Sequence, residues 1–387
     1  MPDRSYFDWN ATAPLRPEAA AALQAGLAVV GNPSSVHAEG RAARRFVENA
    51  REQVAALVGA RPGDVCFTAS GTEANMLALT PKLETADEIR PRDRLLISAV
   101  EHSSVRAGGR FPPGSVTELA VDAAGRVDLD ALKLALAGTA RPLVSLMLAN
   151  NETGVLQPVA AAAAVVHDAG GLLHVDAVQA AGRIPIDINA LGADLMTLSA
   201  HKIGGMKGVG ALVWRHEGIH IADPLVRGGG QERGLRAGTE NVLGIATFGA
   251  AATAALAGMA AEAARMRTLR DALEAGLRAV APRAVVFGAA AERLPNTTLF
   301  AAPGLTAETA VIAFDLEGIA VSSGAACSSG KVQPSHVLAA MGVSPEIVRG
   351  AVRVSLGWDS TETDVQRFLT AWRTLVTALS KGEGIAA

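Results

Sequence analysis

The sequence of 387 residues is poor in cysteine, with only Cys66 and Cys327. Two thiols are too few for a disulfide framework or a four-thiolate metal centre, so we predict neither of them and no metal site. Lys and Arg number 35 against 38 Asp and Glu, a net charge of −3, and the sequence has no block of basic residues. This charge pattern argues against nucleic acid as a partner.

Long apolar segments are also scarce. The first seven residues, Met1-Pro-Asp-Arg-Ser-Tyr-Phe7, lack the apolar core of a signal peptide. We expect no stretch to reach the roughly 18 uncharged apolar residues of a membrane span. A cytoplasmic protein without membrane contact is therefore predicted. Hydrophobic residues make up 49% of the chain and charged residues 19%, which is typical of a globular protein long enough for two domains.

Apolar runs alternate with helical patterns through the first part of the chain. The amphipathic pattern predicts a helix over 38–58, and further helices are expected from residue 70 and over 158–169. Continuous apolar strands separated by helices predict an α/β fold, with a mostly parallel sheet covered on both faces. We expect these strands over residues 64–68, 95–99, 143–148, 172–176, 194–199 and 210–214.

The pattern changes in the last third of the sequence. An Ala-rich helical region over about 240–280 reads as a connector, and shorter strands and helices follow it. We predict a large domain over 13–255 and a smaller α+β domain formed by 1–12 and 256–387. The expected strands are 284–287, 296–300, 319–322 and 351–355, with helices near 306–317, 334–341 and 361–380.

Reactive and polar residues follow the predicted strands of the large domain. Ligands bind at the carboxyl ends of strands in such sheets. Lys202 closes one apolar run and Asp176 another. A desolvated lysine can form a Schiff base, and pyridoxal phosphate (PLP) needs such a lysine together with a carboxylate for its ring nitrogen. The alternative is a lysine that only extends its charged end from the strand into solvent.

Other strand ends offer groups for the rest of such a cofactor. Ser70-Gly71-Thr72-Glu73 has the pattern of a capping box at a helix start, where free backbone N–H groups bind phosphate, although such a box is usually only structural. We expect Ser199 and His201 to add donors to the phosphate. Gln179 and Asn151 are candidates for the ring hydroxyl, and His102 for stacking on the ring and moving protons, unless it is a solvated loop histidine.

Cys327 and Arg353 are candidates for the substrate side of the site. Cys327 lies in a Gly/Ser/Ala loop over 322–330, where a mobile thiol can attack as a thiolate unless it is an incidental exposed cysteine. We expect the part of this loop from Gly324 to Gly330 to be mobile. Cys66, within a predicted strand, is expected to be an inert core residue. Arg353 in the centre of a strand needs a carboxylate, either of a substrate or of the protein itself.

Taken in order, several motifs resemble one known family. The chain resembles the cysteine desulfurases of the NifS/IscS type, in the class V aminotransferase group of fold type I PLP enzymes. The matching segments cover nearly the whole chain: Gly31-Asn-Pro-Ser-Ser-Val-His37, Ala69-Ser-Gly-Thr-Glu-Ala-Asn75, Val100-Glu-His-Ser103, Asn150-Asn-Glu-Thr-Gly154, His174-Val-Asp-Ala-Val-Gln179, Ser199-Ala-His-Lys202, Gly228-Gly-Gly-Gln-Glu-Arg-Gly234, Arg236-Ala-Gly-Thr-Glu240 and Ser322-Ser-Gly-Ala-Ala-Cys327.

The resemblance implies a division of roles. Lys202 carries PLP and moves the Cα proton, while Cys327 takes sulfur from L-cysteine as a persulfide and leaves L-alanine. Asn32 and Arg353 bind the substrate carboxylate. Thr239 of a partner subunit joins Gly71, Thr72, Ser199 and His201 at the phosphate. The resemblance also implies a homodimer and a sulfur-acceptor protein, for example in iron–sulfur cluster assembly.

Three residues depart from the family pattern: Trp9, Met206 and Trp358. They bear on the substrate and on partner surfaces rather than on the reaction. The competing hypotheses are a class V aminotransferase or another PLP lyase, which would not need Cys327, and a weakly active scaffold that binds sulfur acceptors. The presence of Lys202, Asp176, His102 and Cys327 together argues against the scaffold.

Overall fold

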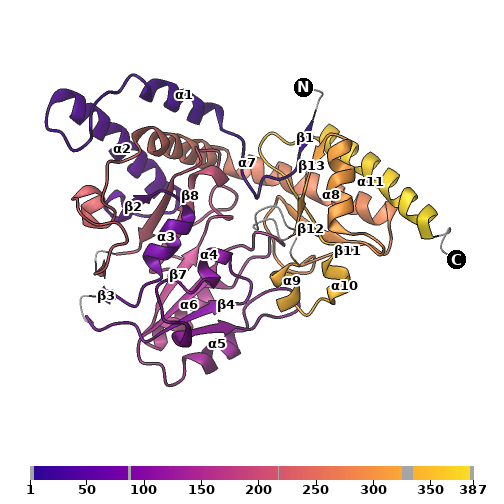
Figure 1. The fold of residues 1–387 in the computed structure, drawn as a ribbon, viewed down its shortest axis with the longest axis horizontal. Coiled ribbons are helices and arrows are strands. Elements are labelled where there is room, and N and C mark those ends of the chain that lie inside the picture. The colour runs from indigo at the N-terminus through magenta and orange to yellow at the C-terminus, as the bar shows by residue number, and fades with distance from the viewer. Residues whose placement is uncertain (1–3, 86–88, 217, 325–333, 384–387) are drawn as a thin grey trace.

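The computed structural model describes residues 4–85, 89–216, 218–324 and 334–383. Its largest element is a seven-stranded sheet in the order β2-β9-β8-β7-β6-β4-β5 (Figure 1). The strands from β8 to β5 run parallel, and β9 is antiparallel to both neighbours. The predicted mostly parallel α/β sheet is therefore confirmed. The strands are β2 (Val65–Thr68), β4 (Arg94–Ser98), β5 (Val116–Leu119), β6 (Pro142–Met147), β7 (Leu172–Asp176), β8 (Leu195–Ser199) and β9 (Gly210–Trp214).

Both faces of this sheet are buried under helices. Val144 and Leu146 of β6 pack into one apolar cluster, whereas Leu143 of the same strand packs into another on the opposite face. Alternate side chains of a strand point to opposite faces, so a strand covered on both sides must be apolar throughout. The first cluster includes residues of α2 (Ala38–Leu57), α5 (Leu129–Leu136), α6 (Val159–Asp168) and α7 (Val242–Val280), and the second residues of α3 (Gly71–Ala78) and α4 (Ser103–Arg106).

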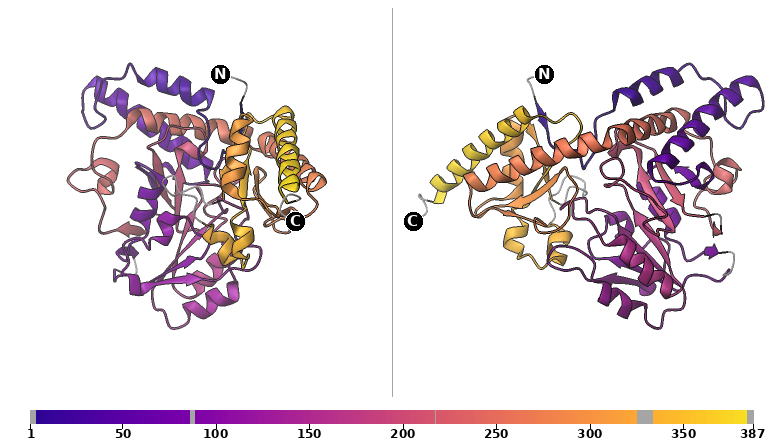
Figure 2. Two further views of the ribbon diagram at one scale, coloured as in Figure 1. Left: turned by 45° about the vertical axis from the view of Figure 1, so that its right-hand side comes forward. Right: turned by 180° about the vertical axis from the view of Figure 1, so that it is seen from behind.

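Helix α7 is 39 residues long and runs from the seven-stranded sheet to a second large sheet of four strands (Figure 2). It packs against α2 and α1 (Pro17–Gly26) at one end and against α11 (Glu362–Glu383) at the other. One window of α7 is long and apolar enough to cross a membrane by length and composition, so our expectation that no such stretch exists is wrong. More than half of that window is buried inside the protein, which explains its composition.

The second large sheet has four antiparallel strands in the order β11-β12-β15-β14. Phe300, Phe314, Phe368 and Trp372 pack together between this sheet and its helices. The apolar runs of the last third therefore form a core of their own. The elements are β11 (Val285–Val286), β12 (Thr297–Ala301), β14 (Ser322–Ser323), β15 (Val352–Ser355), α8 (Ala307–Leu316), α9 (His336–Ala340) and α10 (Pro345–Val348).

The predicted strand over 319–322 is divided between two sheets. Its first half is β13 (Ile319–Ala320), which pairs with β1 (Ser5–Tyr6), and its second half begins β14. The N-terminal segment thus runs beside the second sheet, where Asp8 bridges to Ser355, before it reaches the first. This course agrees with the predicted assignment of residues 1–12 to the small domain, although the domain boundaries themselves remain predictions.

The remaining elements are short. An antiparallel pair joins β3 (Leu83–Thr85) to β10 (Ile219–Ile221) at the edge of the molecule. Short 3-10 turns complete the described chain: η1 (Pro62–Asp64), η2 (Pro113–Ser115), η3 (Ala200–Lys202) and η4 (Gln231–Gly234).

Candidate active site

A cavity of about 260 Å³ opens at the carboxyl ends of β7 and β8. Most of the residues that the sequence predicts for the site line it, although they come from distant parts of the chain. They are Gly71, Thr72, His102, Asn151, Asp176, Gln179, Ser199, His201, Lys202 and Arg353. The N-terminal segment also contributes Asn10 and Ala11, which the sequence did not indicate.

Lys202 ends the η3 turn that follows β8, and its amine is held by backbone oxygens. Lys202 Nζ donates to the carbonyls of Asn10 at 2.6 Å and Ala11 at 2.7 Å. The Asn10 side chain is itself fixed, because its Nδ2 donates to Thr297 Oγ1 at 3.0 Å in β12. The lysine therefore turns toward the cavity wall, and the hypothesis that it only extends into solvent is wrong.

Asp176 lies at the end of β7, with 6% of its surface exposed. Its Oδ2 accepts from Asn75 Nδ2 at 2.9 Å, and its Oδ1 accepts from the Val178 N–H at 3.0 Å. These bonds fix the carboxylate in one orientation. Asn75 was not predicted as a site residue, because its contact with Asp176 spans 101 positions and leaves no pattern in the sequence.

Gln179 is oriented by a buried arginine. Arg183 Nη1 donates to Gln179 Oε1 at 2.6 Å, which leaves the Gln179 amide nitrogen as the donor, to the Asn10 carbonyl at 3.0 Å. Burial, followed by the charge of Arg353, lowers the pKa of Arg183 to about 9, so the guanidinium remains charged at neutral pH. Among the described residues, no carboxylate forms an ion pair with Arg183; its other hydrogen bonds go to backbone oxygens.

His102 precedes α4 and caps its first turn. Its Nδ1 lies 2.8 Å from Ser104 Oγ and accepts from the Ser104 N–H at 3.2 Å. The neighbouring Glu101 is fully buried, and its Oε1 accepts from the Met147 N–H at 2.6 Å. Burial, and then the charge of Asp176, raise the pKa of Glu101 well above its ordinary value. No pattern in the sequence indicated a carboxyl with a raised pKa beside Asp176.

The other end of the cavity suits an anion. Ser70 caps α3 by accepting from the Glu73 N–H at 3.1 Å, while Glu73 Oε2 accepts from the Ala69 N–H at 3.0 Å. The predicted capping box is thus present, except that Glu73 reaches Ala69 rather than Ser70. The first amide groups of a helix have no partner within it and attract anions. Burial, and then the charges of two lysines, lower the pKa of His201 to about 4, so this histidine is neutral.

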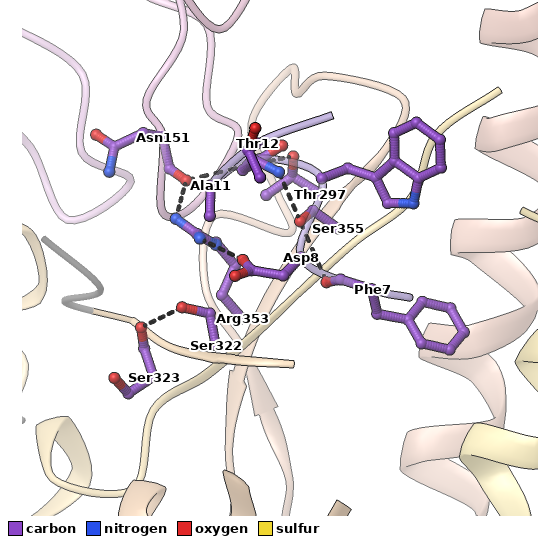
Figure 3. A network of polar contacts seen from close by, with 12 residues as sticks. Phe7, Asp8, Ala11, Thr12, Asn151, Thr297, Ser322, Ser323, Arg353 and Ser355 are labelled. Atoms are coloured by element: carbon purple, nitrogen blue, oxygen red, sulfur yellow. Dashed lines mark hydrogen bonds and ion pairs between the residues drawn. The ribbon is translucent and has the colours of Figure 1, made fainter. Parts of the chain in front are cut away.

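Arg353 in β15 lines the cavity and lies beside Asp8 and Asn151 (Figure 3). Its Nη2 pairs with Asp8 Oδ1 at 2.8 Å, and its Nη1 donates to the Asn151 carbonyl at 3.0 Å. The ion pair within the protein, one of the two alternatives for a buried arginine, is therefore present. Arg353 Nε is buried and has no hydrogen-bond partner among the described residues, so the guanidinium still has a donor to offer.

Three predicted residues are not placed in this cavity. Cys327 lies outside the described residues, as does most of its loop, so the prediction of a mobile loop is not tested. Asn32 and Thr239 are exposed and do not line the cavity of this single chain. Cys66 in β2 is fully buried, and burial raises the pKa of its thiol, which confirms it as an inert core residue.

Two of the three departures from the family pattern pack against each other. The rings of Trp9 and Trp358 meet edge to face with centroids 4.6 Å apart, and Arg16 lies over Trp358 at 4.0 Å. A Cβ at Gly357 would come within 2.0 Å of Trp9, so glycine is required there. The two tryptophans are therefore one packing unit beside the cavity. Met206 donates its N–H to Thr247 Oγ1 of α7 at 3.1 Å.

The donor set of the cavity fits PLP. A lysine amine, a fixed carboxylate and a helix N-terminus are the groups that would take its aldehyde, ring nitrogen and phosphate. Lys202, Asp176 and Gly71 supply these groups on one cavity. The buried Asn75 donates to Asp176 Oδ2 and so helps to hold this carboxylate in place.

Comparison with known proteins gives consistent results. Residues 5–368 match the family of class-V aminotransferases. The chain is 45% identical to a cysteine desulfurase of Cereibacter sphaeroides, covering 95% of this chain and 94% of the relative, and 40% identical to an IscS-like cysteine desulfurase of Mycobacterium tuberculosis, covering 94% of each. The structure of a NifS-like protein from Rickettsia africae superposes with a TM-score of 0.87 at 36% identity, covering 96% of this chain and 99% of the other.

Proposed function

The chain belongs to the class-V aminotransferase family, and from this premise we propose that it is a PLP-dependent cysteine desulfurase. The reaction is Cys327–SH + L-cysteine → Cys327–S–SH + L-alanine, in which the sulfur leaves Cβ of the substrate and bonds to the Cys327 thiolate. The single observation that carries the proposal is the convergence of Lys202 and Asp176 on one cavity, in a chain similar to cysteine desulfurases over almost its whole length.

The residues of the cavity divide the work. Bound PLP would act as the electron sink that weakens the bond between Cβ and sulfur. Asp176, held by Asn75 and the Val178 N–H, would keep the ring nitrogen protonated. Lys202 Nζ would bind the cofactor and move the proton at Cα. Arg353 would hold the substrate carboxylate, with its orientation maintained by Asp8.

We include a homodimer in this proposal. The loop that contains Ser34 and the loop that contains Gln231 both carry exposed apolar side chains. The two loops lie next to each other, since Gln231 Nε2 is 3.4 Å from Ser34 Oγ. The exposed residues are Val30, Val36, Leu225 and Val226. A partner that covers this surface would bury them, as expected at an interface.

The same two loops carry Asn32 and Thr239, the predicted site residues that stand apart from the cavity of their own chain. In the proposed dimer both residues serve the cavity of the partner subunit. A monomer in solution with full activity would contradict this arrangement.

The fate of the sulfur completes the proposal. We assign the persulfide to a protein acceptor in the cytoplasm, such as an iron–sulfur scaffold. Candidate acceptors incubated with the enzyme and labelled cysteine would take up sulfur only while Cys327 is present. The competing functions, an aminotransferase or another PLP lyase, need the cavity but not this thiol.

The deciding experiment follows alanine formation from cysteine. Cys327→Ser should bind PLP with the parent absorbance spectrum, yet form no persulfide and almost no alanine. The control is Cys66→Ser, which alters the buried thiol. This variant should leave turnover largely intact and should lower the free energy of unfolding by on the order of 1 kcal/mol. Alanine formation by Cys327→Ser at the parent rate would give preference to the aminotransferase or lyase.

A second experiment tests the assignment of the lysine. Borohydride reduction of the PLP-loaded protein, followed by peptide mapping, should label Lys202, and Lys202→Ala should lose the label. The exposed Lys207, five residues along the chain, is the internal control. A label on Lys207 would remove Lys202 from its role.

A further inference from the structure

We propose that the carboxylate of Asp176 fixes the tautomer of His102 through Asn75 and Ser104, so that an imidazole with a single ring proton carries it on Nε2. Ser104 and Asn75 are then positioning residues for His102. The tautomer follows from hydrogen-bond geometry alone. Only its consequence for the reaction rests on the proposed function.

The first step is the orientation of the Asn75 amide. A carboxylate can only accept hydrogen bonds, so the group that Asn75 presents to Asp176 Oδ2 at 2.9 Å must be its NH₂. The alternative orientation would place the amide oxygen against the carboxylate. Asn75 is 1% exposed, and its Oδ1 has no hydrogen-bond partner among the described residues. The orientation of the amide is therefore determined by the Asp176 carboxylate.

The second step passes from Asn75 to Ser104. The same Nδ2 has a second hydrogen, which it donates to Ser104 Oγ at 2.9 Å. A serine hydroxyl that accepts on one side still has its own proton to donate. The acceptor for that proton is His102 Nδ1, 2.8 Å from Ser104 Oγ. In the series of hydrogen bonds from Asp176 through Asn75 and Ser104 to His102, the donor and the acceptor of each bond are therefore fixed.

The third step fixes the ring. His102 Nδ1 also accepts from the Ser104 backbone N–H at 3.2 Å, and a backbone N–H cannot change from donor to acceptor. Two donors thus converge on Nδ1, which must present its lone pair. The neutral ring has one proton, so that proton lies on Nε2.

The tautomer limits what His102 can do in the cavity that it lines. Nε2–H is a hydrogen-bond donor and cannot accept a proton. For the ring to act as a base, Nδ1 would have to take the proton, which requires the Ser104 hydroxyl to rotate and the backbone contact to break. His102 therefore presents Nε2–H as a hydrogen-bond donor, and in the proposed reaction the transfer of the Cα proton would fall to Lys202. This narrows the acid/base role that the family resemblance implies.

The test is nitrogen NMR of the PLP-loaded protein labelled with ¹⁵N in its histidine rings, with His102→Gln to assign the signals. We expect a pyrrole-type Nε2 and a pyridine-type Nδ1 for His102. Ser104→Ala removes one of the two donors at Nδ1 and keeps the backbone N–H, so it should shift both signals part of the way toward the average of the two tautomers. It should also lower kcat roughly fivefold, the effect of one neutral hydrogen bond, with KM for cysteine nearly unchanged. Ser104→Thr, which keeps the hydroxyl, should restore the parent spectrum.

Ser103→Ala is the matched control, because Ser103 is the exposed neighbour at the start of α4. It should leave the His102 signals in place. A pyrrole-type Nδ1 in the parent, or a Ser104→Ala spectrum identical to that of the parent, would overturn the proposal. These signals do not depend on turnover, so a protein that lacked desulfurase activity but showed the expected spectrum would refute only the proposed function.

Discussion

Arg183 is a buried cation, and no carboxylate among the described residues forms an ion pair with it. Replacing it with methionine removes a buried charge that costs desolvation, so Arg183→Met should raise the melting temperature. The same change releases the Gln179 amide and should weaken PLP binding by roughly 10- to 100-fold, the value of a hydrogen bond to a charged group. Thermal unfolding without PLP and a fluorescence titration with PLP measure the two effects.

Arg183→Lys is the control for the charge, because it retains the cation and one donor toward Gln179. It should lie between the parent and the methionine variant in both measurements. If Arg183→Met lowered both stability and PLP affinity, the arginine would be a structural residue and its proposed control of Gln179 would be wrong.

Residues with a distinctive chemistry could be predicted from the sequence, and their supports could not. Lys202 and Asp176 stand out because each interrupts an apolar run with a charge. Asn75 and Ser104 are ordinary helix residues by composition, and their importance comes from contacts 101 and 29 positions away in the sequence. A pattern along the chain carries no information about such contacts.

At the scale of elements, Gly210 sets the distance between β9 and the turn that begins α3. A Cβ at this position would lie 2.3 Å from the Ser70 carbonyl carbon and 2.6 Å from the Gly71 nitrogen. Gly210→Ala should therefore push the N-terminus of α3 away, cost about 1–3 kcal/mol of unfolding free energy and weaken PLP binding. Urea unfolding and PLP titration check both effects.

Gly63→Ala is the matched control, because nothing lies within 4 Å of a Cβ at Gly63. It should leave stability and PLP binding close to those of the parent. A Gly210→Ala variant as stable as Gly63→Ala would show that the turn can shift without loss.

The long elements were predictable because burial on both faces imposes a continuous apolar run. The predicted strand over 172–176 matches β7 (Leu172–Asp176), and the helical region over 240–280 matches α7 within two residues at its start. The two-residue strands were not predictable in the same way. The division of 319–322 into β13 and β14 depends on β1 and β15, and partners at such separations leave no periodicity in the sequence.

At the scale of the whole molecule, Glu152 joins the loop after β6 to helix α9 of the C-terminal part of the chain. This fully buried residue in the loop after β6 accepts from Ser335 Oγ, which caps α9. Burial raises the pKa of Glu152 to about 7 despite opposing effects of Ser335 and Arg353. In the unfolded state Glu152 loses its proton near its ordinary pKa of 4.5, whereas in the folded state it keeps the proton up to about pH 7. The contribution of Glu152 to the free energy of unfolding therefore falls as the pH rises from about 4.5 to 7.

Glu152→Gln should therefore stabilise the protein at pH 8, by up to about 3 kcal/mol, and have little effect at pH 5. Melting temperatures of parent and variant at the two pH values test this. Glu52→Gln, which changes an exposed glutamate of α2, should show no such difference. A stabilisation that is equal at pH 5 and pH 8 would mean that Glu152 does not titrate in this range.

The position of the N-terminal segment between the two sheets has a consequence for the order in which the protein is made. Ser5 leaves the ribosome 314 positions before its partner Ile319 (319 − 5 = 314), a delay of roughly 15–60 s at 5–20 residues per second. Ala13 can bond to the His201 carbonyl much earlier. Assembly should thus proceed along this segment from Ala13 back to Ser5. The carbonyls that hold Lys202 lie between them, so nascent chains stalled before Ile319 should capture PLP poorly, and borohydride labelling of stalled and released chains would measure the difference.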